Sequence, residues 1–192
     1  MIENIIVSKV RIKLLVVFFS NPTELYHVRG LVRKIDEEIN AVRRELANLE
    51  KAGILKKEPR GNRLYYWLNE NYLYYQELLG LFSKYSGLGG QIIKNKNRVG
   101  KIVYCVFSDK FIRRRERKED EVDVFIVGEI VMAELAGLIK EEEEKRGREI
   151  NYSTMSEEEF VFRKKRNDPF LEGILRASKL MILGDEEELL KN

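Results

Sequence analysis

Apolar residues follow a helical period along the first 50 residues of the chain. The segment "VSKVRIKLLVVFFSN" is apolar on nearly every side, which predicts a mostly buried helix ending at Asn21-Pro22. The segment "LYHVRGLVRKI" predicts a short extended stretch and then a brief helix. A third helix is indicated by apolar residues at steps of three and four, namely Ile39, Val42, Leu46, Leu49 and Ala52.

The ends of the third helix carry their own signals. Asp36 is a suitable N-cap, and Glu37 and Glu38 follow in the first turn, where the helix dipole favours acids. Gly53 closes the helix. The period then changes to alternation in "ILKKEPRGNRLYYWLN", whose turn residues at 59–62 predict a β-hairpin.

The remainder of the chain alternates between strand-like and helix-like segments. Residues 71–98 predict a helix, a glycine-rich break from Gly87 to Gly90 and a second short helix, which we interpret as a linker. Beyond the linker, the sequence predicts four strands and the helices between and after them: strands at 101–107, 122–127, 148–153 and 179–183, and helices at 129–146, within 156–176 and near the C-terminus. Strands separated by helices indicate an α/β or α+β sheet domain. The expected fold class is α+β, with a domain at 1–70, the linker at 71–98 and a small mixed-sheet domain at 99–192.

Charge and composition narrow the class of protein. The 192 residues carry a net charge of only +3, although 35% of them are charged, so any nucleic-acid binding depends on where the cations lie. The only cysteine, Cys105, excludes an internal disulfide, and the only histidine, His27, argues against a His/Cys zinc site. Neither a signal peptide nor an apolar run of membrane-spanning length is evident, so we expect a soluble, cytoplasmic protein with no membrane partner.

The polar side of the third helix suits a DNA groove. Opposite Val42, at about 100° per residue, lie Asn40, Arg44, Ala47 and Lys51, with Arg43 on the flank. In a major groove, arginine can pair with guanine and asparagine with adenine. The hairpin adds cations suited to phosphates, namely Lys56, Lys57, Arg60 and Arg63.

Plainer interpretations of these residues stay open. Any amphipathic helix has a polar face, and a basic hairpin is often a solvated sheet edge that discourages aggregation. Glu37 and Glu38 also oppose DNA binding, because acids at the front of such a helix repel phosphates.

The segment "DEEINAVRRELANLEKAGILKKEPRGNRLYYWLN" resembles the winged helix-turn-helix of the ArsR-like transcriptional regulators. In that family, a recognition helix ending in Leu-x-x-Leu-Glu-x-Ala-Gly-Ile/Leu runs into a basic hairpin with an Arg-Gly-Asn-Arg-x-Tyr-Tyr turn. The matching positions are Leu46, Leu49, Glu50, Ala52, Gly53, Ile54, Arg60, Gly61, Asn62, Arg63, Tyr65 and Tyr66. The resemblance covers about the first 70 residues. It implies a homodimer that binds double-stranded DNA, with two recognition helices about one DNA turn apart.

A different chemistry is indicated by "VFSDKFIRRRERKEDEVDVFIVGE", residues 106–129. Glu121 and Asp123 stand at i and i+2, which would put both carboxylates on one side of a strand. Paired carboxylates can hold Mg²⁺ against the phosphates of a nucleotide. Residues from about 98 to 190 resemble the minimal nucleotidyltransferase-like domains of the polymerase-β type. The later part of this segment matches that family at Gly128-Glu129, Gly147-Arg148-Glu149, Asp168-Pro169-Phe170 and Leu183-Gly184-Asp185-Glu186.

The resemblance implies a phosphate cradle and a magnesium site, from which this chain departs. In the family, the amides of a Gly-Ser turn hold phosphate oxygens and two aspartates bind Mg²⁺. Here Phe107-Ser108 replaces Gly-Ser, and a phenyl ring would obstruct the close approach of a phosphate. Glu121 replaces the first aspartate, Asp123 is retained, and Glu149 is a further candidate ligand beside a weak one, Asn151.

We therefore expect a degenerate transferase domain that acts as a sensor, dimerisation or partner-docking module. Its possible partners are a nucleotide or a protein. No cofactor is expected, and Mg²⁺ is expected only if the site is active. In that case the candidate catalytic residues are Ser108, Glu121 and Asp123. The candidate metal ligands are Glu121, Asp123 and Glu149. The alternative function is an active Mg²⁺-dependent nucleotidyltransferase acting on a protein or RNA. A third possibility is that the winged helix binds a protein instead of DNA. The basic run from Arg113 to Lys118 is interpretable as a solvated loop, a triphosphate or RNA site, or an extension of the DNA surface.

Overall fold

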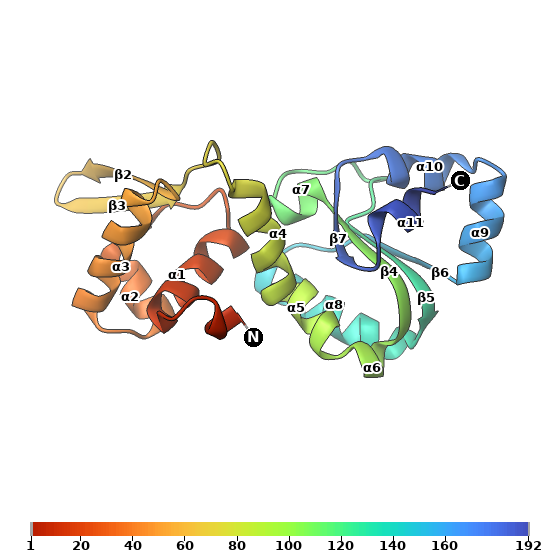
Figure 1. Ribbon diagram of the computed structural model, residues 1–192, viewed down its shortest axis with the longest axis horizontal. Coiled ribbons are helices and arrows are strands. Elements are labelled where there is room, and N and C mark those ends of the chain that lie inside the picture. The colour runs from red at the N-terminus through yellow and green to blue at the C-terminus, as the bar shows by residue number, and fades with distance from the viewer. Residues whose placement is uncertain (1, 192) are drawn as a thin grey trace. The chain divides into compact units, whose positions relative to one another are not determined.

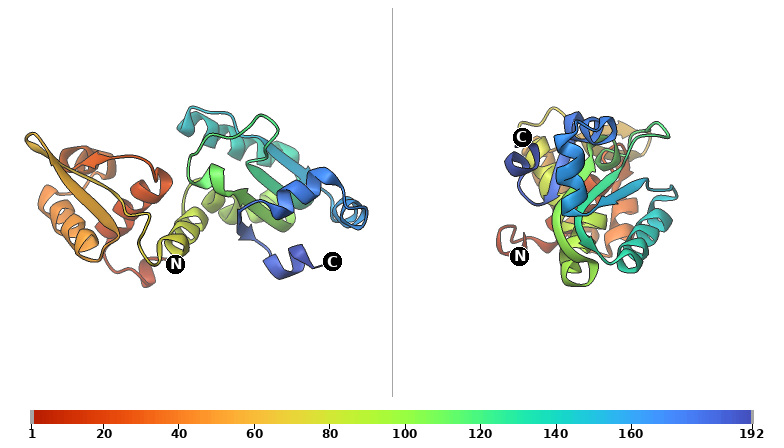
Figure 2. Two further views of the ribbon diagram at one scale, coloured as in Figure 1. Left: turned by 90° about the horizontal axis from the view of Figure 1, so that it is seen from above. Right: turned by 90° about the vertical axis from the view of Figure 1, so that its right-hand side faces the viewer.

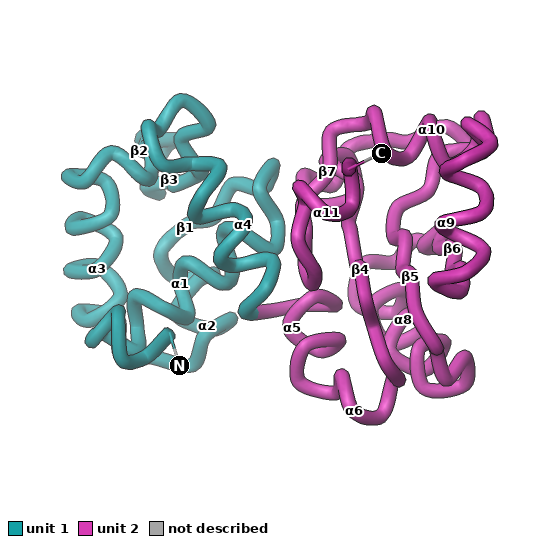
Figure 3. Tube along the Cα trace, turned by 45° about the vertical axis from the view of Figure 1, so that its right-hand side comes forward, with its two compact units in different colours: residues 1–85 teal, residues 86–192 magenta. Residues whose placement is uncertain are grey.

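The computed structural model describes residues 2–191 as a mixed α+β chain with two small sheets (Figures 1 and 2). The chain divides into two compact units, residues 1–85 and residues 86–192 (Figure 3). The boundary between the units falls inside the segment that we expected to be a linker, residues 71–98. Within residues 2–191, the helices are too short or too polar to cross a bilayer.

The first unit combines helices with a three-stranded antiparallel sheet of order β1-β3-β2. Its elements in chain order are η1 (Ile2–Asn4), α1 (Lys9–Ser20), β1 (Tyr26–His27), α2 (Val28–Ile35), α3 (Ile39–Lys51), β2 (Leu55–Arg60), β3 (Arg63–Leu68) and α4 (Tyr75–Tyr85). The three expected helices and the hairpin are confirmed. As expected, α1 is buried over much of its surface, with Leu14 and Phe18 fully enclosed. The rings of Phe19 and Phe82 stack with centroids 5.2 Å apart and join α1 to α4.

The turn between α2 and α3 differs from the sequence-based expectation. Asp36 does not cap α3; it ends α2 in a left-handed conformation with φ of 50°, which aspartate tolerates better than most residues. The chain reverses over residues 36–38, so α3 begins two residues later than expected. Its N-cap is Glu38, whose Oε2 accepts hydrogen bonds from the Asn40 and Ala41 amides at 2.8 and 2.9 Å.

The second unit is built on a four-stranded mixed sheet of order β6-β5-β4-β7, in which only β5 and β6 pair in parallel. Its elements are α5 (Gly87–Lys94), α6 (Lys96–Val99), β4 (Gly100–Ser108), α7 (Asp109–Ile112), β5 (Val124–Ile130), α8 (Met132–Arg146), β6 (Tyr152–Met155), α9 (Glu157–Lys165), α10 (Pro169–Arg176), β7 (Lys179–Leu183) and α11 (Glu186–Leu190). The expected order of strands and helices is confirmed, except that α7 and α6 were not anticipated. The expected helix, break and second short helix are present as α4, Ser86 and α5, but the expected extent of the break is wrong, because Gly87 to Gly90 form the first turn of α5.

Helices cover both faces of this sheet, as the five consecutive buried residues at the start of β5 require. On one face, Val106, Phe125 and Met181 form a core with Phe160, Leu171, Leu175 and Leu189 from α9, α10 and α11. The alternate side chains of the strands, such as Cys105 and Ile126, point to the other face, where α5 and α8 pack against each other. The end of β4 and the chain leading into β5 therefore lie at the rim of a well-packed sheet.

Candidate functional site

The solvent side of α3 carries four of the sequence-derived DNA-binding residues. Val42, Leu46 and Leu49 are buried along one side of the helix. The other side is exposed and holds the set that we call the α3 face: Asn40, Arg43, Arg44 and Lys51. Within residues 2–191, none of the three cations of this face has an ion-pair partner. The structure thus brings these side chains together on one surface, as the helical spacing predicted.

The two acids that opposed DNA binding are both engaged with the protein. Glu37 Oε1 lies 2.6 Å from the Nζ atom of Lys13 on α1. The Glu38 carboxylate caps α3, and the hydrogen bonds from the Asn40 and Ala41 amides hold its pKa below the usual value. The charge of Glu37 is therefore offset by Lys13, whereas Glu38 stays ionised as the cap of α3, so the electrostatic objection to an anionic partner is weakened for Glu37.

A buried glutamate that the sequence analysis missed fixes α3 to α1. Glu45 is 5% exposed; it accepts a hydrogen bond from Ser8 Oγ at 2.9 Å and one from Arg11 Nε at 2.8 Å. Burial acts to raise the pKa of Glu45, but the bonds from Arg11 and Ser8 outweigh it, so the pKa lies below the usual value. The available signal was an acid directly before Leu46 in the apolar stripe. This contact sets the orientation in which the α3 face is presented.

The β2–β3 hairpin presents the other four cations. Arg60 and Arg63 face each other across the two-residue turn at Gly61 and Asn62. The Arg60 guanidinium pairs with Glu58 at 2.9 Å and lies over the ring of Tyr65, which stiffens the tip. Lys57 pairs with Glu50 of α3 at 3.1 Å, whereas Lys56 and Arg63 are exposed without an ion-pair partner among residues 2–191. The hairpin and α3 both lie at the end of the first unit away from α4 (Figures 1 and 2).

In the second unit, the expected phosphate cradle is already bonded to the protein. The Ser108 amide donates to the Asp123 carbonyl at 2.9 Å, and the Asp109 amide donates to the Ser178 carbonyl at 2.9 Å. The Ser108 hydroxyl caps α7 by accepting from the Phe111 amide at 3.2 Å. Both backbone amides of the Ser108-Asp109 pair are therefore already bonded and are not free to receive a phosphate oxygen.

The reason that we expected for the loss of the cradle is wrong. The Phe107 side chain does not obstruct this position; it is buried and meets the ring of Phe111 edge-on, with centroids 5.2 Å apart. The strand alternation sends Phe107 to the face opposite Val106. Hydrogen bonding to neighbouring strands, and not the phenyl ring, occupies the cradle.

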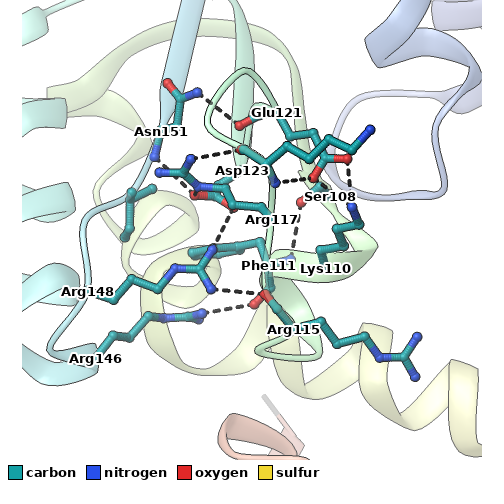
Figure 4. Close-up of polar contacts among 12 residues, drawn as sticks. Ser108, Lys110, Phe111, Arg115, Arg117, Glu121, Asp123, Arg146, Arg148 and Asn151 are labelled. Carbon is teal, nitrogen blue, oxygen red and sulfur yellow. Dashed lines mark hydrogen bonds and ion pairs between the residues drawn. The ribbon is translucent and has the colours of Figure 1, made fainter.

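Asp123 is buried in a cage of cations and one amide (Figure 4). Its side chain is 1% exposed; Oδ2 lies 2.7 Å from Arg117 Nε, and Oδ1 lies 3.3 Å from Arg148 Nη2. The Asn151 amide donates a third hydrogen bond to Oδ2 at 3.0 Å. Both oxygens that would bind a metal ion are therefore committed, and two guanidinium groups supply the opposite charge.

Glu121 is committed in a different way. Lys110 Nζ lies 2.6 and 2.7 Å from its two oxygens, and the Lys118 amide donates to Oε2 at 2.9 Å. These contacts, the one from Lys110 first, lower the pKa of Glu121. Glu121 and Asp123 also precede β5, which begins at Val124, so the expectation that they share one side of a strand is wrong.

The arrangement does not fit a magnesium ion. Glu149 is exposed, and the Asn151 side-chain amide donates to the Glu121 carbonyl at 2.9 Å. Across residues 2–191, no three His, Cys, Asp or Glu side chains are grouped as ligands for a metal ion. Glu121, Asp123 and Glu149 are thus not assembled into a ligand set.

The basic run that leads into these acids serves largely as internal counterions. Arg113 is 8% exposed and its Nε lies 2.6 Å from Asp109 Oδ1, while Arg117 holds Asp123. The interpretation of the run as a wholly solvated loop is therefore wrong. A further arginine, Arg146 of α8, lies over the Phe111 ring at 3.9 Å and donates to the Phe111 carbonyl at 2.9 Å, which fastens α7 to α8.

A cavity of about 630 Å³ opens beside these residues. One wall is the core-facing side of the sheet at Val106 and Phe125, and the other is α10. Four of the charged residues discussed above, Asp109, Lys110, Glu121 and Asp123, belong to its lining. The full lining is Val106, Ser108, Asp109, Lys110, Arg115, Asp120, Glu121, Val122, Asp123, Phe125, Pro169, Phe170, Gly173, Ile174, Ala177, Ser178 and Lys179. Its volume is in the range of small-molecule sites.

Comparison with models of protein families, with curated proteins and with solved structures finds no match to this chain. We therefore infer the function from two features of the structure itself: the α3 face with its hairpin, and the cavity beside Asp123.

Proposed function

We propose that the chain is a DNA-binding transcriptional regulator whose first unit binds duplex DNA as a winged helix. The order of the secondary-structure elements supports this proposal, because α2, a three-residue turn and α3 are followed at once by a two-stranded hairpin. The observation that carries it is the α3 face, on which Arg43, Arg44 and Lys51 are exposed and unpaired within residues 2–191. Cations held on a helix surface without internal partners are suited to an anionic partner.

The two parts of this surface suit different contacts. A helix of the size of α3 enters a major groove, where Arg43 or Arg44 can bond to guanine and Asn40 to adenine. Lys56 and Arg63 on the hairpin suit phosphates, which supply affinity and not sequence selectivity. The proposal includes a cytoplasmic homodimer that reads two half-sites about one DNA turn apart.

We further propose that the second unit binds a ligand without transferring a nucleotide. Phosphoryl transfer needs precise alignment of metal and phosphates. The carboxylate oxygens of Asp123 are held by Arg117 and Arg148, and the amides of Ser108 and Asp109 are held by neighbouring strands. Incubation with labelled nucleoside triphosphates and Mg²⁺ or Mn²⁺ tests this part: label transfer that disappears in Asp123→Ala would establish the enzymatic alternative.

Charge reversal on α3 tests the DNA-binding proposal. Binding of the full chain to labelled duplexes, including the DNA upstream of its own coding sequence, is measured by fluorescence anisotropy and gel shift. We expect Arg43→Glu and Arg44→Glu to weaken binding by at least about tenfold each, as for the loss of a charged contact of 1.4 kcal/mol or more. The matched control is Lys84→Glu, an identical charge change at an exposed site on α4.

Two results would contradict the proposal. One is the absence of salt-sensitive binding to every duplex. The other is equal DNA affinity before and after both Arg43→Glu and Arg60→Glu, which would indicate that the winged helix binds a protein partner.

A further inference from the structure

We infer that the cavity of the second unit binds a small flat molecule with a single negative charge, and that it does so without a metal ion.

The wall formed by α10 suits a flat apolar body. Phe170, Gly173 and Ile174 lie at positions i, i+3 and i+4 and so share one side of the helix, and Ala177 follows at its C-cap. Phe170 remains 41% exposed. A Cβ atom added at Gly173 would meet nothing within 4 Å, so the helix leaves open space at this point. A planar ring can therefore lie against this open side of α10, next to the buried residues Val106 and Phe125 that form the inner end of the lining.

The cavity is lined by one largely enclosed cation, Lys179, whose recorded carboxylate partner lies at the outer limit of an ion pair. The Lys179 side chain is 8% exposed, and Glu186, at 3.9 Å, supplies its only recorded carboxylate among residues 2–191. Its Nζ atom donates instead to the Leu175 carbonyl at 2.6 Å. Carbonyl dipoles solvate an ammonium group but do not cancel its net charge. The cavity therefore favours an anion next to the Lys179 ammonium group.

The remaining charges at the mouth limit the ligand to one negative charge. Lys110 is paired with Glu121, and Arg113 is paired with Asp109, so each of these acids is held beside its own cation. Asp120 is exposed at the same mouth. Because Lys110 and Arg113 are neutralised by their own partners, a polyphosphate would bring several negative charges to a site with few cations left to balance them. A carboxylate or sulfonate on an aromatic or acyl body meets the same surface without this penalty.

The inference specifies the ligand that we proposed for the second unit and so rests on that proposal, but it does not depend on DNA binding by the first unit. Ligand binding is measured on the full chain without DNA, so a failure of the DNA-binding proposal is recognised separately.

Three naphthalene derivatives of one shape and different charge test the inference by calorimetry: 1-naphthoate, 1-naphthalenemethanol and 1-naphthylmethylammonium. We expect naphthoate to bind more tightly than the ammonium compound by at least about tenfold, since one direct charge contact is worth that much. Lys179→Met should reduce the affinity for naphthoate to that for the neutral alcohol.

Gly173→Leu should abolish binding of all three probes, because its side chain would fill the cavity. The matched control is Gly137→Leu on α8, where an added Cβ also meets nothing within 4 Å but which does not line the cavity. Each of the following would overturn the inference: no binding of any probe, equal or tighter binding of the cation, unchanged binding in Gly173→Leu, or tighter binding of Mg²⁺-ATP than of naphthoate.

Discussion

The guanidinium of Arg117 and the carboxylate of Asp123 meet at 2.7 Å, between Nε and Oδ2, with the carboxylate almost fully enclosed. Arg148 contacts the other oxygen of Asp123 from the chain before β6. A protein cation thus stands where a metal ion would be expected from the resemblance of this segment to nucleotidyltransferases. Asp123 is a structural partner that ties the basic loop and the chain before β6 to the start of β5.

Removing the charge of Asp123 should destabilise the protein. Asp123→Asn leaves Arg117 without its counterion in a largely enclosed site, and such a change costs about 3 kcal/mol of unfolding free energy. Urea unfolding measures this cost. Glu121→Gln is the control, because Glu121 lies at the surface and should cost much less; equal losses for the two variants would show that the cage around Asp123 is not the stabilising feature.

Magnesium should leave the stability of the protein unchanged. A metal ion that binds the folded state raises its melting temperature in proportion to the logarithm of its concentration. Because Arg117, Arg148 and the Asn151 amide occupy Asp123, we expect no rise in melting temperature with millimolar Mg²⁺ or Mn²⁺. A rise with the logarithm of metal concentration that Asp123→Asn removes would mean that the arginines give way to a metal.

Stability should fall in acid through Glu45. The pKa of Glu45 is lowered in the folded state from its usual value of 4.5, so its contribution is complete above about pH 4.5 and is lost as pH falls through the folded pKa. At pH 7, Glu45→Gln should cost about 1.5 kcal/mol, a modest value because Arg11 is partly exposed. The difference in unfolding free energy between wild type and Glu45→Gln should shrink as pH falls below 4.5; a difference independent of pH would contradict this role.

Cys105 should be inert in the folded protein. Its side chain is fully buried in β4, and burial strongly raises the pKa of the thiol. Because the thiolate is the reactive form, labelling by a thiol reagent at pH 8 should occur only as fast as the second unit opens. Immediate stoichiometric labelling of native protein would show that the sheet is more accessible than the packing of β4 indicates.

Much of the fold could be predicted from the sequence because its signals are local. The stripe of Val42, Leu46 and Leu49 defined α3, and the Gly61-Asn62 turn defined the hairpin. The order of elements in the second unit followed from alternating periods. Asp36 was assigned wrongly because its left-handed conformation depends on where α2 and α3 pack, which a cap preference does not encode.

The candidate sites were predictable only where they lie on one element. The α3 face follows from helical geometry alone. The partners of Asp123 come from two loops, at Arg117 and Arg148, and no local pattern relates these positions. The same holds for Glu45, whose partners Ser8 and Arg11 are more than 30 residues away in the chain. The occupied amides of Ser108 and Asp109 depend on strand pairing, which the sequence does not state.

The salt dependence of DNA binding tests the proposed function most directly. The logarithm of the binding constant should fall linearly with the logarithm of salt concentration, by about 0.9 for each phosphate neutralised. Arg63→Gln on the hairpin should reduce that slope by about one unit, as for the loss of one phosphate contact, while Lys84→Gln on α4 should leave it unchanged. Binding that is insensitive to salt, or equal slopes for wild type and Arg63→Gln, would contradict binding of DNA through this surface.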